Sequence, residues 1–89
     1  MEIIRCASAG TLESSDVYVE IEPGEAGVQV ELQSVVLDRF GEAINRTVRE
    51  VLSELCVEQA NVRVVDQGAL ECVIRARVET AVLRGKGEK

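Results

Sequence analysis

Two short segments in which apolar and polar residues strictly alternate constrain the fold more than any other feature of this chain. They cover residues 17–22 and 28–33. A period of two places the apolar side chains of a strand on one face, so each segment predicts a strand with one buried side. Residues 23–27 contain a proline and two glycines, which favour a turn. The pattern therefore predicts an antiparallel hairpin. The apolar positions are Val17, Val19, Ile21, Val28, Val30 and Leu32.

After this region the apolar residues recur every three or four positions. Such spacing places them along one side of a helix, and it continues for about five turns. Ser34 is the predicted N-cap, because a serine hydroxyl can accept a hydrogen bond from a free amide of the first turn. Residues 61–66 predict a third strand. The apolar positions of the helix are Leu37, Phe40, Ile44, Val48, Val51, Leu52 and Leu55.

The segment from residue 69 to residue 84 fits either a strand or a helix. Its apolar residues alternate with charged ones, yet they also fall at helical spacing. We predict a helix, because the segment is long, is rich in good helix formers and has no internal glycine or proline. In this helix Arg77 falls near the apolar stripe, so its head group must extend to water.

These elements predict an α+β domain with the order ββαβα, in which a small, mainly antiparallel sheet carries two helices on one face. A chain of 89 residues has the size of one domain, so we expect residues 1–89 to form a single unit. Residues 1–8 are expected to form an edge strand or an ordered arm. Residues 9–16 are expected to form a polar loop, and residues 85–89 a flexible tail.

The charge balance argues against several classes of partner. Ten Lys and Arg residues against sixteen Asp and Glu residues give a net charge of −6. An acidic surface repels phosphate backbones, so nucleic acid is not expected to bind. The apolar runs are too short to span a membrane. The first residues lack the apolar core of a secretory signal, which favours a cytoplasmic location.

No residue has the surroundings of a catalyst or a metal ligand. The chain contains no histidine, the usual base for a serine nucleophile, and we predict no catalytic residue. Cys6, Cys56 and Cys72 are widely spaced, which argues against both a disulfide framework and a zinc site. We expect these three cysteines to be buried or half-buried apolar residues.

The loop at residues 9–16 contains the candidates for a functional site. Ser14 and Ser15 are adjacent and lie between Glu13 and Asp16. By residue chemistry alone, such serines are usually turn residues, because their hydroxyls bond to nearby backbone groups. A serine without a base of its own could instead be a site that another enzyme modifies, which requires only exposure and a docking surface.

Four segments resemble one known family. They are residues 9–17 (AGTLESSDV), 40–44 (FGEAI), 66–72 (DQGALEC) and 75–79 (RARVE). Together, and in this order, they look like the acyl carrier protein, or gamma subunit, of citrate lyase. The resemblance runs from about residue 7 to residue 84.

The resemblance implies a function for the loop. In that family the serine of this motif carries 2'-(5''-triphosphoribosyl)-3'-dephospho-coenzyme A through a phosphodiester. By position this is Ser14; Ser15, where the family commonly has glycine, is the second choice. The terminal thiol of the group holds acetyl or citryl as a thioester. The implied partners are the citrate lyase alpha and beta subunits, which cleave citrate to acetate and oxaloacetate, and the prosthetic-group transferase.

Other functions stay open at this stage. Carriers of citramalate lyase and of malonate decarboxylase use the same kind of prosthetic group. A protein of another class, an interaction module that assembles a complex and carries nothing, would tolerate loss of the serine. An independent enzyme would have to turn over substrate as an isolated chain. The acidic outer faces of the predicted hairpin are candidate docking surfaces by charge, with Tyr18, Glu20, Glu22 and Glu31.

Overall fold

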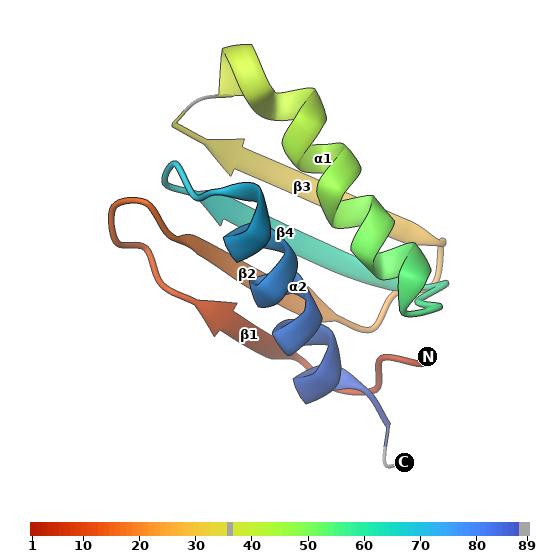
Figure 1. The fold of residues 1–89 in the computed structure, drawn as a ribbon. Coiled ribbons are helices and arrows are strands. Elements are labelled where there is room, and N and C mark those ends of the chain that lie inside the picture. Colours follow the sequence, from red (N-terminus) through yellow and green to blue (C-terminus); the bar gives the residue numbers. More distant parts are fainter. Residues whose placement is uncertain (36, 88–89) are drawn as a thin grey trace.

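The computed structural model describes residues 1–35 and 37–87, apart from the side chains of residues 37 and 38. Within this part, four strands form one sheet and two helices cover one of its faces (Figure 1). The predicted two-layer α+β fold is thus confirmed. The elements are β1 (Ala7–Gly10), β2 (Val17–Glu22), β3 (Val28–Ser34), α1 (Leu37–Glu54), β4 (Ala60–Asp66) and α2 (Glu71–Gly85).

The predicted hairpin between the two alternating segments is wrong. The strand order is β1-β2-β4-β3, so β4 lies between β2 and β3. β4 pairs antiparallel with β2 and parallel with β3, and β1 pairs antiparallel with β2. Two of the three pairings are antiparallel, as predicted, but the segments joined by residues 23–27 are not neighbours.

Burial explains why β4 takes the central place. The even-numbered residues of β4 are buried along its whole length, from Ala60 at 0% exposure to Asp66 at 1%. The apolar side chains of β3 are only half-buried, which suits an edge strand. Strands lie about 4.8 Å apart, so the five residues between β2 and β3 can cross the width of one strand. Helix α1 then returns the chain from β3 to β4, as a parallel pairing requires.

The first strand was only partly predicted. The edge strand or arm expected at residues 1–8 is strand β1, which extends two residues into the expected loop. Ala9 is buried, at 3% exposure, and pairs with Val19. The element order is therefore βββαβα, and the loop between β1 and β2 covers residues 11–16.

Helix α1 matches its prediction except at its start. Ser34 is the last residue of β3, and its hydroxyl donates to a carboxylate oxygen of Asp66 at 2.8 Å. Residue 36, directly before the helix, lies outside the described residues, so the N-cap role of Ser34 stays a prediction. Phe40 is 49% exposed, and the side chain of Leu37 lies outside the described residues. The rest of the predicted stripe contributes to the core, with Leu55 half-buried at its edge.

Helix α2 confirms the choice of helix for the last segment. The chain beyond it is hydrogen bonded as far as residue 87. The backbone of Lys86 forms a β-bridge with Ile3, and the N–H of Gly87 donates to the carbonyl oxygen of Glu2 at 3.1 Å. Residues 85–87 of the predicted flexible tail are therefore held by hydrogen bonds, and residues 88 and 89 lie outside the described part.

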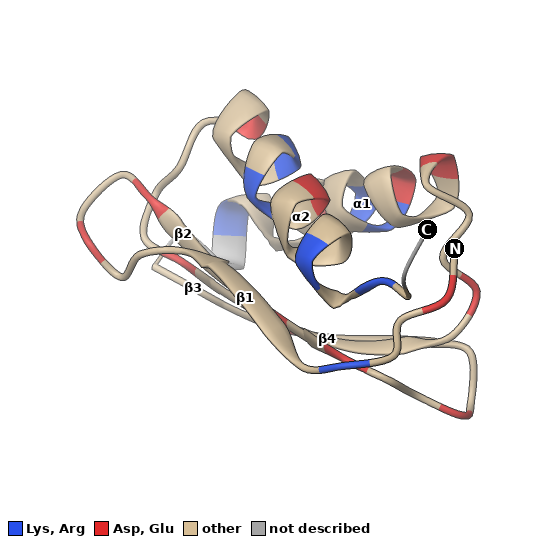
Figure 2. Ribbon diagram, turned by 90° about the horizontal axis from the view of Figure 1, so that it is seen from below, with Lys and Arg blue, Asp and Glu red and all other residues tan. Residues whose placement is uncertain are grey.

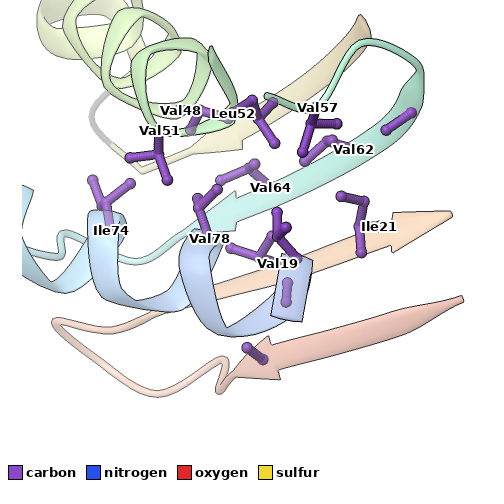
Figure 3. Packing of buried hydrophobic residues seen from close by; sticks show 14 of the residues in the cluster. Val19, Ile21, Val48, Val51, Leu52, Val57, Val62, Val64, Ile74 and Val78 are labelled. Carbon is purple, nitrogen blue, oxygen red and sulfur yellow. The ribbon is translucent and has the colours of Figure 1, made fainter. Parts of the chain in front are cut away.

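The core is aliphatic and lies between the sheet and the two helices (Figure 3). Leu52 of α1 and Val78 of α2 meet the inner faces of the central strands, and each is at most 1% exposed. Ile3 from the N-terminal segment and Val57 from the turn after α1 also belong to this core. The packing leaves the opposite face of the sheet open.

Candidate functional site

The loop that joins β1 to β2 projects from one end of the sheet, away from both chain termini (Figure 1). Ser14 and Ser15 are both exposed. The backbone N–H of Asp16 donates to the carbonyl oxygen of Glu13 at 3.1 Å, which closes a β-turn with the two serines as its central residues. Both hydroxyls are therefore at the tip of the loop.

The backbone distinguishes the two serines. Ser15 has a φ of 67°, in the left-handed region that favours glycine. Glycine is the common residue here in the family that the sequence resembles, and the turn gives a physical reason for it. The N–H of Ser15 donates to the carbonyl oxygen of Gln67 at 2.8 Å, and the N–H of Gln67 donates back to Asp16 at 2.9 Å. These bonds dock Ser15 onto the turn after β4, whereas Ser14 is the outer residue.

Asp16, the last residue of the loop, connects the loop to helix α2. Its carboxylate accepts two hydrogen bonds from the guanidinium of Arg77 in α2, at 3.1 Å from Nε and 2.9 Å from Nη2. The hydroxyl of Thr11 donates to the same carboxylate at 2.6 Å and accepts from the N–H of Glu13 at 3.2 Å. We call Asp16, Arg77 and Thr11 the Asp16 clamp. It ties both ends of the loop to helix α2.

The clamp also sets the charge state of its acid. The hydrogen bonds from Arg77 hold the pKa of Asp16 well below its usual range, and those from Thr11 and the Val17 N–H act in the same direction. The side chain of Asp16 is 15% exposed and that of Arg77 is 39% exposed. The ion pair thus neutralises the charge of Asp16, and Glu13 is the exposed negative charge of the serine turn.

We expect the contribution of Asp16 to stability to depend on pH. Because its pKa is lower in the folded chain than the value of about 3.9 for a free aspartate, the clamp stabilises the fold above about pH 4 and loses its effect as the pH falls further. The measurement is urea unfolding of the wild type and of Asp16→Asn from about pH 6 to about pH 2. The stability gap between them should shrink as the pH falls; a constant gap would show that the charge of Asp16 contributes nothing.

A second acid supports the neighbouring turn. Asp66, at the end of β4, is 1% exposed. Its carboxylate accepts hydrogen bonds from the N–H groups of Gly68 at 3.1 Å and Ala69 at 3.0 Å, in addition to the Ser34 hydroxyl. Buried acids need such partners. These hydrogen bonds fix the turn after β4. Because the backbone of Gln67 in that turn is hydrogen bonded to Ser15 and Asp16, the serine loop is held by the Asp16 carboxylate on one side and, through this turn, by the Asp66 carboxylate on the other.

The cysteines differ from their prediction. Cys6, Cys56 and Cys72 are unpaired and exposed, not buried or half-buried. Cys72 lies in the first turn of α2 and Cys56 follows the end of α1. Across residues 1–35 and 37–87, no group of three or more Cys, Asp and Glu side chains is arranged to hold a metal ion.

The open face of the sheet is less acidic than predicted. Glu20 in β2 forms an ion pair with Arg63 of β4 at 3.0 Å and accepts a hydrogen bond from the Tyr18 hydroxyl at 3.0 Å. The hydrogen bond from Arg63 also lowers the pKa of Glu20. Because β4 separates β2 from β3, Glu31 is not on the same hairpin as Glu20. Figure 2 shows acidic and basic positions on both layers of the molecule.

Sequence reasoning identified the serine turn and missed its supports. Arg77 was expected to extend its head group to water, and instead it binds Asp16. The signal was present, because a charged residue beside an apolar stripe usually has a partner. Nothing in the local pattern indicated that the partner would be 61 positions away. Asp66 gave no signal beyond being the last residue of a predicted strand.

Comparisons with known proteins place this small domain among the acyl carrier proteins. Residues 4–85 match the acyl carrier protein family described as malonate decarboxylase delta subunit (MdcD). The chain is 59% identical over 85 residues to the citrate lyase acyl carrier protein of Escherichia fergusonii, covering 94% of this chain and 88% of that protein. It is 50% identical over 88 residues to the one from Haemophilus influenzae, covering 99% and 92%. The chain belongs to the citrate lyase acyl carrier protein family.

A solved structure has the same fold. The chain superimposes with a TM-score of 0.81 on a chain from the crystal structure of a Pseudomonas malonate decarboxylase hetero-tetramer in complex with malonate. The match covers 92% of this chain and 84% of that one, at 22% identity. At this identity the likeness supports the fold alone. In the described part of the chain, neither helix is long and apolar enough to cross a membrane.

Proposed function

We propose that this chain is the acyl carrier subunit of a citrate lyase complex and carries on Ser14 the group that remains of 2'-(5''-triphosphoribosyl)-3'-dephospho-coenzyme A after diphosphate has left. The observation that supports it most directly is the outer position of Ser14 in a turn that is supported from both sides. A carrier needs an exposed attachment atom on a stable base, and it needs no catalytic group of its own. When bound, the group would supply a thiol that holds acetyl or citryl as a thioester.

The residues around Ser14 are compatible with this group. Ser14 and its neighbours Leu12 and Glu13 are exposed, so a bulky nucleotide on Oγ would meet solvent. The nearest inner acid, Asp16, is paired with Arg77, which reduces repulsion of a phosphodiester. Arg77 is engaged by this pairing, so the chain offers a covalent attachment point and not a preformed phosphate pocket.

Attachment would proceed by nucleotidyl transfer to the serine. The Oγ of Ser14 forms a bond to the inner phosphorus of the triphosphate precursor, the bond from that phosphorus to the next bridging oxygen breaks, and diphosphate leaves. The hydroxyl proton must go to a base of the transferase, since no histidine is present in this chain. Ser14 therefore contributes the nucleophile and the partner contributes the catalyst.

The test is mass spectrometry of the intact chain and its peptides after incubation with the prosthetic-group transferase and the triphosphate precursor. We expect one adduct on the peptide that contains Ser14. The adduct should be lost in Ser14→Ala and kept in Ser15→Ala. An adduct that is lost only in Ser15→Ala would correct the site, and no adduct from a transferase active on another carrier would overturn the proposal.

Which acyl group the chain carries is the more specific part of the proposal. The matching family is described by a malonate decarboxylase subunit, whereas the relatives at 50–59% identity are named for citrate lyase. The higher identity favours citrate. A modified chain mixed with the citrate lyase alpha and beta subunits should support citrate cleavage; support of malonate decarboxylation in a matched mixture instead would reassign the complex.

A further inference from the structure

We propose that Arg77 is a positioning residue for the modification of Ser14, acting through Asp16. This inference rests on the proposed function. Arg77 comes from the second turn of helix α2 and binds Asp16, the residue that ends the loop. The helix is packed into the core through Ile74 and Val78 on either side of Arg77, so Arg77 connects the loop to a helix that the core holds in place.

The path of the Arg77 side chain depends on Gly10. A Cβ placed on Gly10 would lie 3.2 Å from Cδ of Arg77 and 1.9 Å from the carbonyl oxygen of Val17. The missing side chain thus lets the stem of the arginine pass over the end of β1 to reach Asp16. Gly10 directly before the loop, Asp16 at its end and helix α2 therefore pack against one another.

The two-point contact is what fixes the turn. Nε and Nη2 of Arg77 each bind one carboxylate oxygen of Asp16, a fork geometry that sets the plane of the carboxylate as well as its distance. The fixed carboxylate then receives the hydroxyl of Thr11. Lysine offers a point charge without this fork, so it should restore the charge but not the orientation of the loop.

Arg75 provides a matched control on the same helix. It is 34% exposed, close to the 39% of Arg77, and it too forms ion pairs. Its partners are Glu54, at 2.7 Å, and Glu50, at 3.5 Å, both on helix α1. Loss of Arg75 removes charge and an ion pair of comparable kind without touching the serine loop.

The experiment is steady-state kinetics of prosthetic-group transfer to the wild type, Arg77→Lys, Arg77→Met and Arg75→Met. We expect Arg77→Met to lower kcat/KM by about tenfold to a hundredfold, since misplacement of an attacking atom by about 1 Å can cost this much. The loss should appear in kcat more than in KM, because the serine turn still binds the transferase but holds the Oγ of Ser14 away from the position needed for attack. Arg77→Lys should recover part of the loss, and Arg75→Met should match the wild type.

A second variant separates positioning from global stability. Thr11→Val removes the other side-chain donor to Asp16 from the exposed side of the loop and leaves α2 intact, so it should lower kcat in the same direction even if Arg77→Met folds poorly. Amide hydrogen exchange supplies a readout independent of activity. The N–H groups of Ser15 and Asp16 should lose protection in Arg77→Met while those of β4 keep theirs.

Each outcome decides one statement. Transfer to Arg77→Met and Thr11→Val at the wild-type rate, or equal losses in Arg77→Met and Arg75→Met, would overturn the positioning role and leave the proposed function intact. Failure of the wild type to accept the group would overturn the proposed function, and the positioning role with it. Loss confined to the Arg77 and Thr11 variants, with partial recovery in Arg77→Lys, supports both.

Discussion

Replacing Gly10 by alanine is expected to lower the free energy of unfolding by about 3 kcal/mol or more. Gly10 has a φ of 92°, a conformation that an L-residue adopts only under strain. The added Cβ would also lie 1.9 Å from the carbonyl oxygen of Val17. Because that atom belongs to the backbone of the paired strand, the end of the β1–β2 hairpin would have to open. A chain of 89 residues has roughly 4–13 kcal/mol of total stability, so the loss is a large fraction.

Gly27→Ala is the matched control. Gly27 has a similar φ of 79°, but a Cβ there meets nothing within 4 Å. It should cost only the strain of the left-handed backbone, about 1 kcal/mol. Thermal unfolding measures both, with a fall of roughly 4–8 °C per kcal/mol for a domain of this size. Equal losses in the two variants would show that the close approach of Gly10 to Val17 adds no cost.

The periodicity of the sequence predicted most of the elements, because period reports which side chains are buried. β2, β3, α1 and α2 all lie within a residue or two of their predicted bounds. β1 was harder to find because its residues, Ala7–Gly10, are all small. Burial of a small residue such as Ala9 leaves no hydrophobic pattern to read.

The order of the strands in the sheet could not be predicted from periodicity. The turn residues at 23–27 favour a change of direction, and β2 and β3 do run in opposite directions. The turn residues do not specify whether another strand lies between β2 and β3. That choice depends on the burial of the inner face of β4 along its whole length, which the tertiary structure determines. The same limit applies to the site. Ser14 was proposed from a local motif, whereas the Arg77–Asp16 pair exists only because α2 packs over β1 and β2.

Replacing Ser14 by alanine is expected to abolish citrate cleavage by a complex assembled with citrate lyase alpha and beta subunits. Without the hydroxyl oxygen no phosphodiester can form, so the carrier has no thiol to present, and a partial effect is not expected. The fold should be unaffected within about 0.5 kcal/mol, because Ser14 is exposed and such surface substitutions usually cost little. Activity of the assembled complex and urea unfolding of the isolated chain measure the two parts.

Ser15→Gly is the control that makes this result specific to the attachment atom. It removes the neighbouring hydroxyl and supplies the residue that a φ of 67° favours, so both stability and cleavage activity should be kept. If the Ser14→Ala complex assembles and still cleaves citrate, the chain acts as an interaction module and carries nothing. If both variants lose activity while binding the alpha and beta subunits normally, the loss is not specific to the Ser14 hydroxyl, and the assignment of Ser14 as the attachment atom is contradicted.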